Sequence, residues 1–354
     1  MQPVPPLPHP VHELDFAPLA SLVASVFQGA PLVCEPMPGG ASTRRYFRVK
    51  IPDVVGSAIA MFVPDGAKPE EIAKDRTGAG GRWPFLEVRD LLESRGVDVP
   101  TIYAEDPAHG WLLLEDLGDL TLANVLAAQP ERREELYLAA VSDLARAQSA
   151  LAVLPEGSIV RSRAFDEELL SWEVHHFREW ALEARGIGLS ADDRASFGEI
   201  ASRLSRRIAA WPRTFVHRDY QSRNLMVRAN GRLCWIDFQD ALLGPQVYDL
   251  VALLNDSYQA FGRDFVDARL DDYARARALD GAQRRSLGRE FDLVTVQRKL
   301  KDAGRFVYID RVKGNPSFLK FVTPTIARAR ASLRRLSDDQ DMRALDDMLA
   351  RVLH

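Results

Sequence analysis

The sequence is poor in cysteine and has no long apolar run. Cys34 and Cys234 are its only cysteines, and they lie far apart in unrelated contexts. We expect both thiols to be reduced and buried, because a disulfide or metal site needs cysteines in a related pattern. No apolar stretch approaches the roughly 18 residues that a membrane span needs. The first residues, MQPVPPLPHPVHEL, lack the basic start and apolar core of a signal peptide, so a cytoplasmic protein without a membrane partner is expected.

The sequence also lacks an excess of charge of either sign. Its 46 Lys and Arg residues nearly balance 50 Asp and Glu residues, which leaves a formal net charge of -4. Because nucleic acid is bound through a basic field, no nucleic-acid partner is expected. The 354 residues, 46% of them hydrophobic, suffice for two lobes of a globular protein, although they predict no oligomeric state.

The character of the chain changes near residue 118. Before it, short apolar segments bounded by Gly, Pro or Asp predict strands at 46–51, 57–63 and 111–115, with one helix at 84–95. After it, apolar residues recur at helical spacing around 163–184, 191–210, 246–280 and 282–311 and from 324 to the end, interrupted by a β-like segment at 215–238. We predict an α+β fold with a small β-rich N-lobe (1–117, of which 1–14 form a loose arm) and a larger helical C-lobe (118–354).

The β-like segment lies within FVHRDYQSRNLMVRANGRLCWIDFQD, residues 215–240. Its Asn230-Gly231 pair lies between two strand-like runs and predicts a hairpin, because a type I′ turn needs positive φ at both central residues. A two-residue loop would place Asn224 opposite Asp237, with Cβ atoms roughly 4.5–5.5 Å apart. An amide oxygen and a carboxylate at that separation can share one hard divalent cation, so we predict a metal site there.

Asp219 precedes Asn224 in the turn that enters the first strand of this hairpin. Taken alone, Asp219 is expected to cap a turn, Asn224 to end a strand and Asp237 to start a loop. Taken together, HRD-x4-N, the hairpin and I-D-F favour phosphoryl transfer, in which a carboxylate receives the proton of the acceptor hydroxyl and Mg²⁺ offsets the phosphate charge. We therefore predict Asp219 as the base, with His217 and Arg218 beside it, and Asn224 and Asp237 as Mg²⁺ ligands.

The motif from His217 to Asn224, followed by Ile236-Asp237-Phe238, resembles the protein-kinase-like aminoglycoside/choline phosphotransferase superfamily. Gly244-Pro245 and Tyr248-Asp249-Leu250 extend the likeness. The resemblance implies a two-lobe protein-kinase-like fold, ATP and Mg²⁺ as cofactors, and a small hydroxylated substrate. It also implies that Asp249 stabilises the loop around Asp219.

Other stretches resemble bacterial kinases that phosphorylate the anomeric hydroxyl of N-acetylmuramate and N-acetylglucosamine in peptidoglycan recycling. These stretches are RRYFRV (44–49), WPFLEVRDLLESRGVDVPTIYAED (83–106), GWLLLEDLGD (110–119), WEVHHFREW (172–180) and VQRKLKDAGRF (296–306). The resemblance implies an amino-sugar acceptor. Arg298 and Lys301, one helical turn apart, would then face a lactyl carboxylate if their helix borders the pocket.

The chain has no G-x-G-x-x-G loop to cover the phosphates, and only PGGASTRRYF (38–47) can take its place. Gly39 and Gly40 allow close approach of the backbone, and Ser42 and Thr43 offer hydroxyl and amide donors, although a plain β-turn is equally consistent. The segment 112–119 resembles the lobe connection of these kinases. That likeness implies main-chain contacts to adenine at two residues, Glu115 and Leu117.

Met61 occupies the strand position at which typical kinases of this kind carry a lysine, and a thioether cannot pair with phosphate. The resembling amino-sugar kinases tend to have Met there as well. Either a cation from another position takes over or none is used. The candidate cations are Arg44, Arg45, Lys68 and Lys74.

Two alternatives to an amino-sugar kinase stay open. One is a nucleotide-binding pseudokinase, which Met61 favours and the retained Asp219 disfavours. The other is an aminoglycoside or other small-molecule kinase, although cationic aminoglycosides need a strongly acidic acceptor pocket and the predicted C-lobe mixes both charges. Candidate acceptor-site residues, each also explained as surface or scaffold, are Glu173, His176, Asp240, Asp256, Arg298 and Arg311.

Overall fold

The computed structural model describes residues 14–28, 31–38, 44–51, 56–64 and 82–353. The chain forms two compact units, one within residues 1–74 and 100–116 and the other within 75–99 and 117–354. The helix at 84–94 falls inside the predicted N-lobe range but packs with the second unit. The predicted loose arm, except for its last residue, lies outside the described residues.

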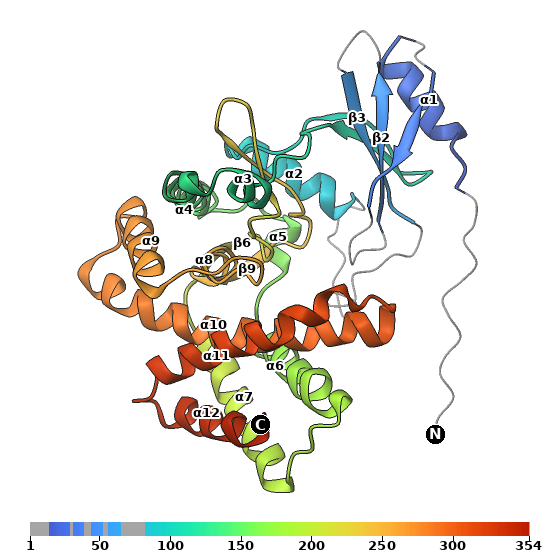
Figure 1. Ribbon diagram of the computed structural model, residues 1–354. Coiled ribbons are helices and arrows are strands. Elements are labelled where there is room, and N and C mark those ends of the chain that lie inside the picture. Colours follow the sequence, from blue (N-terminus) through green and yellow to red (C-terminus); the bar gives the residue numbers. More distant parts are fainter. Residues whose placement is uncertain (1–13, 29–30, 39–43, 52–55, 65–81, 354) are drawn as a thin grey trace. The chain divides into compact units, whose positions relative to one another are not determined.

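A five-stranded antiparallel sheet with strand order β1-β2-β3-β5-β4 forms most of the first unit (Figure 1). Its elements are α1 Ala17–Val26, β1 Cys34–Pro36, β2 Arg45–Ile51, β3 Gly56–Phe62, β4 Ile102–Asp106 and β5 Trp111–Glu115. The strands predicted at 46–51, 57–63 and 111–115 are therefore confirmed. β3 pairs with both β2 and β5, so it lies in the middle of the sheet.

The core of the first unit follows from the alternation along β2. Phe47, Val49 and Ile51 are buried, and the residues between them are more exposed, as the two-residue period of a strand requires. They pack with Trp111 of β5 and with Leu19 of α1 in one apolar cluster. The unit thus has a hydrophobic core of its own.

The second unit is mainly helical (Figure 1). Its helices are α2 Pro84–Ser94, α3 Leu122–Ala128, α4 Arg133–Ala150, α5 Ile159–Ser162, α6 Glu167–His176, α7 Ala191–Ala209, α8 Tyr248–Leu254, α9 Arg263–Ala276, α10 Gly281–Lys313, α11 Val322–Arg335 and α12 Gln340–Val352, with 3₁₀ or π turns η1 Pro130–Arg132, η2 Phe177–Leu182, η3 Glu183–Arg185 and η4 Pro316–Phe321. The helical patterns at 191–210 and 282–311 are confirmed as α7 and α10.

The patterns at 246–280 and beyond 324 each contain two helices instead of one. The second break is explained by Asp339, whose carboxylate accepts hydrogen bonds from the N–H groups of Asp341 and Met342 at 3.1 and 3.4 Å. A side chain in this N-cap position starts a new helix. Asp280 does the same for α10, in a capping box with Gln283.

Two small antiparallel pairs lie among these helices. β7 Leu225–Val227 pairs with β8 Leu233–Trp235, and β6 Arg213–Val216 pairs with β9 Leu242–Pro245. β9 lies outside the predicted β-like segment at 215–238. Strands this short acquire their character from a partner rather than from their own composition.

α10 is the longest helix, with 33 residues, and it packs on α6, η2, α8 and α11 (Figure 1). Gly304 allows α10 to approach η2 closely, because a Cβ atom there would lie 2.5 Å from the carbonyl oxygen of His176 and 2.9 Å from the amide nitrogen of Phe177. Both of these are backbone atoms, which cannot turn aside as a flexible side chain can. The absence of a side chain at Gly304 therefore sets the distance between these two elements.

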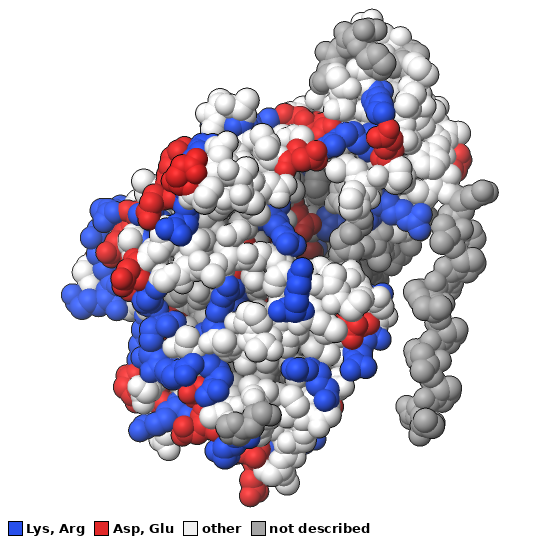
Figure 2. All heavy atoms as spheres, viewed as in Figure 1, with Lys and Arg blue, Asp and Glu red and all other residues white. Residues whose placement is uncertain are grey.

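Figure 2 shows acidic and basic side chains intermingled over the helical part of the chain rather than one basic field. Several of them are paired, as in the ion pairs of Arg203 with Asp341 at 2.8 Å and of Arg207 with Asp339 at 2.7 Å, which join α7 to the region of α12. Within the ranges that the structure describes, no helix combines the length and apolar character of a membrane span.

Candidate active site

The hairpin that carries Asn224 and Asp237 forms, but its predicted register is wrong. Val227 rather than Arg228 pairs with Leu233, and Asn224 is hydrogen-bonded through its carbonyl oxygen to the N–H of Ile236 at 3.0 Å. Among Asn230 and Gly231, only Gly231 has positive φ, at 80°, so the turn is not type I′. A longer loop closed between Arg228 and Arg232 shifts the pairing by one residue. Asp237 consequently follows the residue opposite Asn224 instead of facing it.

Two residues near the predicted base have left-handed backbone conformations. Arg218 has φ of 76° and Asp237 has φ of 63°. Non-glycine residues in this region store strain of about 1–3 kcal/mol and persist only where the surroundings enforce them. Such strain is concentrated at functional sites. We call residues 217–224, which include Arg218 and the predicted base Asp219, the catalytic segment.

Asp249 of α8 holds the start of the catalytic segment. Its fully buried carboxylate accepts hydrogen bonds from the backbone N–H groups of His217 at 2.7 Å and Arg218 at 3.0 Å. Burial raises the pKa of Asp249 to about 7, and the two N–H donors oppose that shift. These bonds fix the left-handed backbone at Arg218. The expected stabilising role of Asp249 is confirmed.

His217 is buried and serves as an acceptor within the same turn. Its Nδ1 accepts a hydrogen bond from the backbone N–H of Asp219 at 3.3 Å. Burial lowers the pKa of His217 to about 4, so the ring is neutral at pH 7. Tyr220 and Trp235 pack their rings edge-on against it. His217 therefore shapes the backbone at Asp219 and carries no charge of its own at neutral pH.

Arg218 is paired with a buried acid of α6. Its guanidinium donates to Glu173 Oε1 at 3.2 Å, and Gln297 Nε2 donates to the other oxygen of Glu173 at 2.7 Å. Both charged side chains are buried, at 5% and 0% exposure. A buried pair of this kind is costly unless its remaining polar atoms are bonded. Glu173, predicted as a substrate contact, thus touches the catalytic segment itself.

Asp256 holds the other end of the segment. Its Oδ2 accepts hydrogen bonds from the N–H of Ser222 at 3.1 Å and from the Ser222 hydroxyl at 2.5 Å. Its Oδ1 accepts from the N–H of Tyr258 at 3.0 Å, and the residue is fully buried. The carboxylates of Asp249 and Asp256 together clamp the segment on both sides of Asp219.

The oxygens of Asn224 and Asp237 suit a magnesium ion. The Asn224 amide nitrogen donates a hydrogen bond to the carbonyl oxygen of Asp219 at 2.8 Å. This bond distinguishes the amide nitrogen from the amide oxygen, and the oxygen is the atom that can bind a metal. Asp237 supplies a carboxylate one residue beyond the partner of Asn224. Magnesium takes one or two carboxylates with phosphate and water oxygens rather than an all-protein cage. The described residues contain no cluster of three or more His, Cys, Asp and Glu suited to a metal.

Arg298 reaches Asp219 from α10. Its Nη2 donates to Asp219 Oδ1 at 3.2 Å, and its Nη1 donates to the carbonyl oxygen of Arg218 at 2.7 Å. Lys301, predicted beside it on the same face, pairs with Asp302 at 3.4 Å. Both cations are buried and paired with carboxylates of the protein. A role for them in binding a lactyl carboxylate is therefore not supported by these contacts.

Two further predicted acceptor-site residues, Asp240 and His176, have different surroundings. Gln239 Nε2 donates both to Asp240 and to Asp237 at 3.1 Å, which places Asp240 beside the predicted metal ligand. His176 lies in α6 among the rings of Trp172, Trp180 and Tyr308. Their contacts with a substrate stay predictions.

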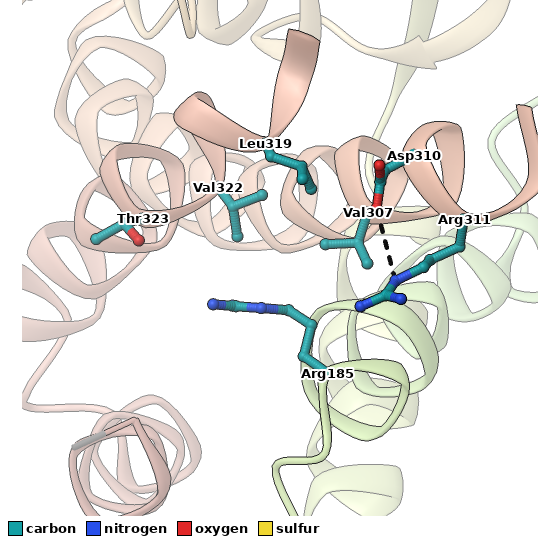
Figure 3. Close-up of a pocket in the computed structure, with 7 residues that line it drawn as sticks. All are labelled: Arg185, Val307, Asp310, Arg311, Leu319, Val322 and Thr323. Atoms are coloured by element: carbon teal, nitrogen blue, oxygen red, sulfur yellow. Dashed lines mark ion pairs between the residues drawn. The ribbon is translucent and has the colours of Figure 1, made fainter. Parts of the chain in front are cut away.

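Arg311 lines a separate pocket, about 20 Å further along α10 than Arg298 from the helical rise of about 1.5 Å per residue. The pocket has a volume of about 170 Å³, and Figure 3 shows Arg185 extending across it toward α11. Arg311 is paired there with Asp310 at 3.5 Å. The structure does not bring Arg311 to the catalytic segment.

The predicted phosphate-loop residues Gly39, Gly40, Ser42 and Thr43, and the candidate cations Lys68 and Lys74, lie outside the described part of the chain. Glu115 ends β5, and its side chain accepts a hydrogen bond from the N–H of Thr101 at 3.1 Å. Leu117 follows and is half-buried. Met61 is fully buried in β3, so no charge enters the first unit at that position.

The sequence did not predict the buried polar contacts of Ser222, Lys299 and Asp302. Lys299 is fully buried and donates to Asp302 at 2.8 Å and to the hydroxyl of Ser257. Burial alone would raise the pKa of the Asp302 carboxyl. The nearby cations of Lys299, Arg298 and Lys301 instead hold this pKa well below its usual range. The only sequence signal was the run of charged residues around Lys299 and Asp302. This signal is weak, because a solvent-exposed helix also carries charges on several sides.

Comparisons with known proteins agree on the family and the fold. Residues 33–286 match the phosphotransferase enzyme family. The N-acetylmuramate/N-acetylglucosamine kinase of Pseudomonas aeruginosa is 35% identical over 291 residues, which are 80% of this chain and 79% of that protein. The kinase of the same name from Neisseria meningitidis serogroup B is 33% identical over 307 residues, with coverage of 84% and 83%.

Among solved structures, choline kinase LicA from Streptococcus pneumoniae superposes with a TM-score of 0.58 at 17% identity, covering 90% of this chain and 98% of that one. Identity at this level shows the fold alone. The predicted α+β, protein-kinase-like fold is confirmed.

Proposed function

We propose that this chain, which belongs to the phosphotransferase enzyme family, phosphorylates the anomeric hydroxyl of N-acetylmuramate, N-acetylglucosamine or both, using Mg²⁺-bound ATP. Phosphotransfer follows from membership of the family. The amino-sugar acceptor is supported by relatives at 33–35% identity over about four fifths of the chain that bear that name. A role in recycling cell-wall sugars in the cytoplasm would follow from this acceptor.

The observation that carries the mechanism is the clamped catalytic segment. Asp249 and Asp256 hold its backbone on both sides of Asp219, and Arg298 holds the Asp219 carboxylate. Preorganised groups of this kind lower the barrier because they need not be reordered during the reaction. A pseudokinase would have no physical need for a clamped carboxylate beside two metal ligands.

The proposed reaction assigns one task to each group. The anomeric oxygen forms a bond to phosphorus, the bond from phosphorus to the leaving diphosphate breaks, and Asp219 takes the hydroxyl proton. When bound, Mg²⁺ would be held by Asn224 and Asp237 and would offset charge on the phosphate oxygens. An anomeric hydroxyl is more acidic than an ordinary sugar hydroxyl, so a carboxylate is an adequate base for it.

The acceptor is tested by incubating the protein with ATP, Mg²⁺ and each amino sugar, with an aminoglycoside and an ordinary hexose as comparison acceptors. The expected product has lost its reducing end and releases phosphate in mild acid, as glycosyl phosphates do. A product that still reduces alkaline copper would carry its phosphate elsewhere and would contradict the anomeric assignment. Phosphorylation of the aminoglycoside alone would contradict the acceptor class.

The base is tested by Asp219→Asn. Loss of a general base should lower kcat by roughly 10²–10⁴-fold. Nucleotide affinity should change little, because the residue is proposed to face the acceptor. Turnover close to that of the unchanged protein would remove Asp219 from the mechanism.

A further inference from the structure

Arg298 is a fully buried cation in contact with the catalytic segment. It lies near the middle of α10, and its side chain is 0% exposed. Every residue of α10 from 291 to 304 is buried, whereas the Asp219 side chain that Arg298 contacts is 42% exposed. A lone guanidinium in such a place is expensive and is retained only where the protein compensates it.

The compensation comes from two different atoms of the catalytic segment. One nitrogen of the Arg298 guanidinium donates to the carbonyl oxygen of Arg218 at 2.7 Å, and another donates to Asp219 Oδ1 at 3.2 Å. The ring of Tyr248 lies 4.8 Å from the same guanidinium. Because a guanidinium is planar and its donors are fixed in a fork, these two bonds orient the peptide at 218 and the carboxylate at 219 together.

Arg298 also lies near a carboxylate of its own helix. Its Nε lies 3.9 Å from Asp302, and Lys299 fixes Asp302 at 2.8 Å. Six residues beyond Arg298, the close approach of Gly304 to the backbone of His176 sets the position of α10 against η2. The guanidinium therefore stands on a rigid helix rather than on a loop, which is the arrangement that holds a functional group to within fractions of an ångström.

We propose that Arg298 is a positioning residue, which orients the Asp219 carboxylate to accept the proton of the acceptor hydroxyl. This inference rests on the proposed role of Asp219 as base. It replaces the predicted contact of Arg298 with substrate by a contact with the base. A group that only orients the base stabilises the transition state and not the bound substrate, so its loss should appear in kcat rather than in KM.

The test compares Arg298→Ala and Arg298→Lys with the matched control Arg269→Ala. Arg269 is a buried arginine of α9, and its guanidinium contacts Asp272 and Glu134 rather than residues 217–224. We expect Arg298→Ala to lower kcat about 100-fold, the scale of a misplacement by 1 Å, with KM for sugar and nucleotide changed less than about threefold. Arg269→Ala should lower the melting temperature but leave kcat within about threefold.

Chemical rescue separates positioning from general loss of structure. Guanidinium ion at millimolar concentration should raise kcat of Arg298→Ala at least about tenfold by filling the vacated site, and urea, its neutral analogue, should not. Arg298→Lys should recover only part of the activity, because an ammonium lacks the planar fork that reaches both oxygens. If Arg298→Ala does not fold, Arg298→Lys carries the test through its kcat.

The outcomes also separate this inference from the proposed function. Failure of the unchanged protein to phosphorylate an amino sugar counts against that function, and the variants are then compared on whichever acceptor it does use. A folded Arg298→Ala protein with unchanged kcat, while Asp219→Asn is impaired, would overturn the positioning role alone. A kcat loss that Arg269→Ala matches and that guanidinium does not rescue would overturn it too. Full activity of Arg298→Lys would do the same if Arg298→Ala does not fold.

Discussion

At the scale of single residues, the left-handed backbone of Arg218 and Asp237 marks where the chain accepts strain. At Arg218 the cause is visible, because Asp249 binds two successive N–H groups and Arg298 binds the carbonyl. Asp237 lies just beyond the regular pairing of β7 and β8, and Gln239, which donates to its side chain, is only two residues away. The bonds at Arg218, in contrast, come from residues distant in sequence.

The two proposed metal ligands should differ in their effects when replaced. Asp237→Ala should lower turnover at least about 100-fold, the scale for removing a preorganised electrostatic partner, because a carboxylate supplies charge. Asn224→Ala should raise the Mg²⁺ concentration for half-maximal rate and weaken turnover less, because an amide supplies only a dipole. Titration with Mg²⁺ and Mn²⁺ measures both effects.

The matched control for Asn224 is Asn230→Ala. Asn230 is an exposed residue of the same hairpin, and its side chain accepts a hydrogen bond from the N–H of Arg232. We expect this variant to keep the Mg²⁺ dependence of the unchanged protein. An unaltered Mg²⁺ dependence in both Asp237→Ala and Asn224→Ala would remove the metal site from the hairpin.

His217 should make stability depend on pH. Burial lowers its pKa to about 4 in the folded chain, against about 6.5 in the unfolded chain, so the unfolded chain binds more protons between these values. The stability that neutral His217 contributes is therefore present above pH 6.5 and is lost as pH falls toward 4. The neighbouring Asp249, whose pKa is raised, acts in the opposite direction, so total stability alone does not isolate the effect.

A difference measurement isolates it. The free energy of unfolding of the unchanged protein minus that of His217→Asn should be largest near pH 7 and should shrink toward pH 4. Denaturant titrations at several pH values give both quantities. A difference that is constant over this range would mean that His217 is not desolvated as the structure shows.

At the scale of elements, the contact between α10 and η2 depends on Gly304. Gly304→Ala places a Cβ atom against backbone atoms of His176 and Phe177, which must move. Although Ala favours a helix over Gly by about 1 kcal/mol, overpacking typically costs about 1–3 kcal/mol, so we expect net destabilisation. A lower kcat should accompany it, because α10 carries Arg298. Thermal unfolding and steady-state kinetics measure the two effects.

Gly288→Ala is the control on the same helix. A Cβ there would lie 3.6 Å from a nitrogen of the flexible Arg263 side chain, an ordinary contact. This variant should be as stable as the unchanged protein or more stable by up to about 1 kcal/mol. Equal effects of the two substitutions would show that the close approach at Gly304 does not limit packing.

The hairpin shows why element type was predictable and register was not. The strand-like runs on either side of Asn230-Gly231 correctly predicted two strands and a turn. The loop length, however, depends on which of the two turn residues adopts positive φ, and only Gly231 does. A shift by one residue moves every pairing, so a local error in the turn displaced the predicted contact of Asn224 with Asp237.

At the scale of the whole molecule, each of the two units has its own apolar core. Trp111 lies in the core of the first unit, packed on the rings of Phe47 and Phe62. Trp111→Ala should destabilise that unit by about 3–5 kcal/mol. In hydrogen exchange, the amides of β4 and β5 should lose protection while those of α8 and α10 keep most of theirs. Uniform loss across the chain would mean that the two units unfold as one.

The sequence by itself determined the types of the main elements, the family and the chemistry. These are local properties: apolar periodicity predicts strands and helices, and residues 217–224 with 236–238 carry the residue types that phosphoryl transfer requires. Composition alone also predicted mixed surface charge, as Figure 2 shows.

Only the tertiary structure decided which charges are buried and what they contact. Arg298 and Arg311 lie on one helix and are equally plausible as substrate contacts in the sequence, yet Arg298 meets Asp219 whereas Arg311 lines a distant pocket. The difference arises because burial of a helical residue depends on which elements cover its face, and α10 is covered by α6, η2, α8 and α11. Such packing joins residues about 80 positions apart, and no local pattern in the chain specifies it.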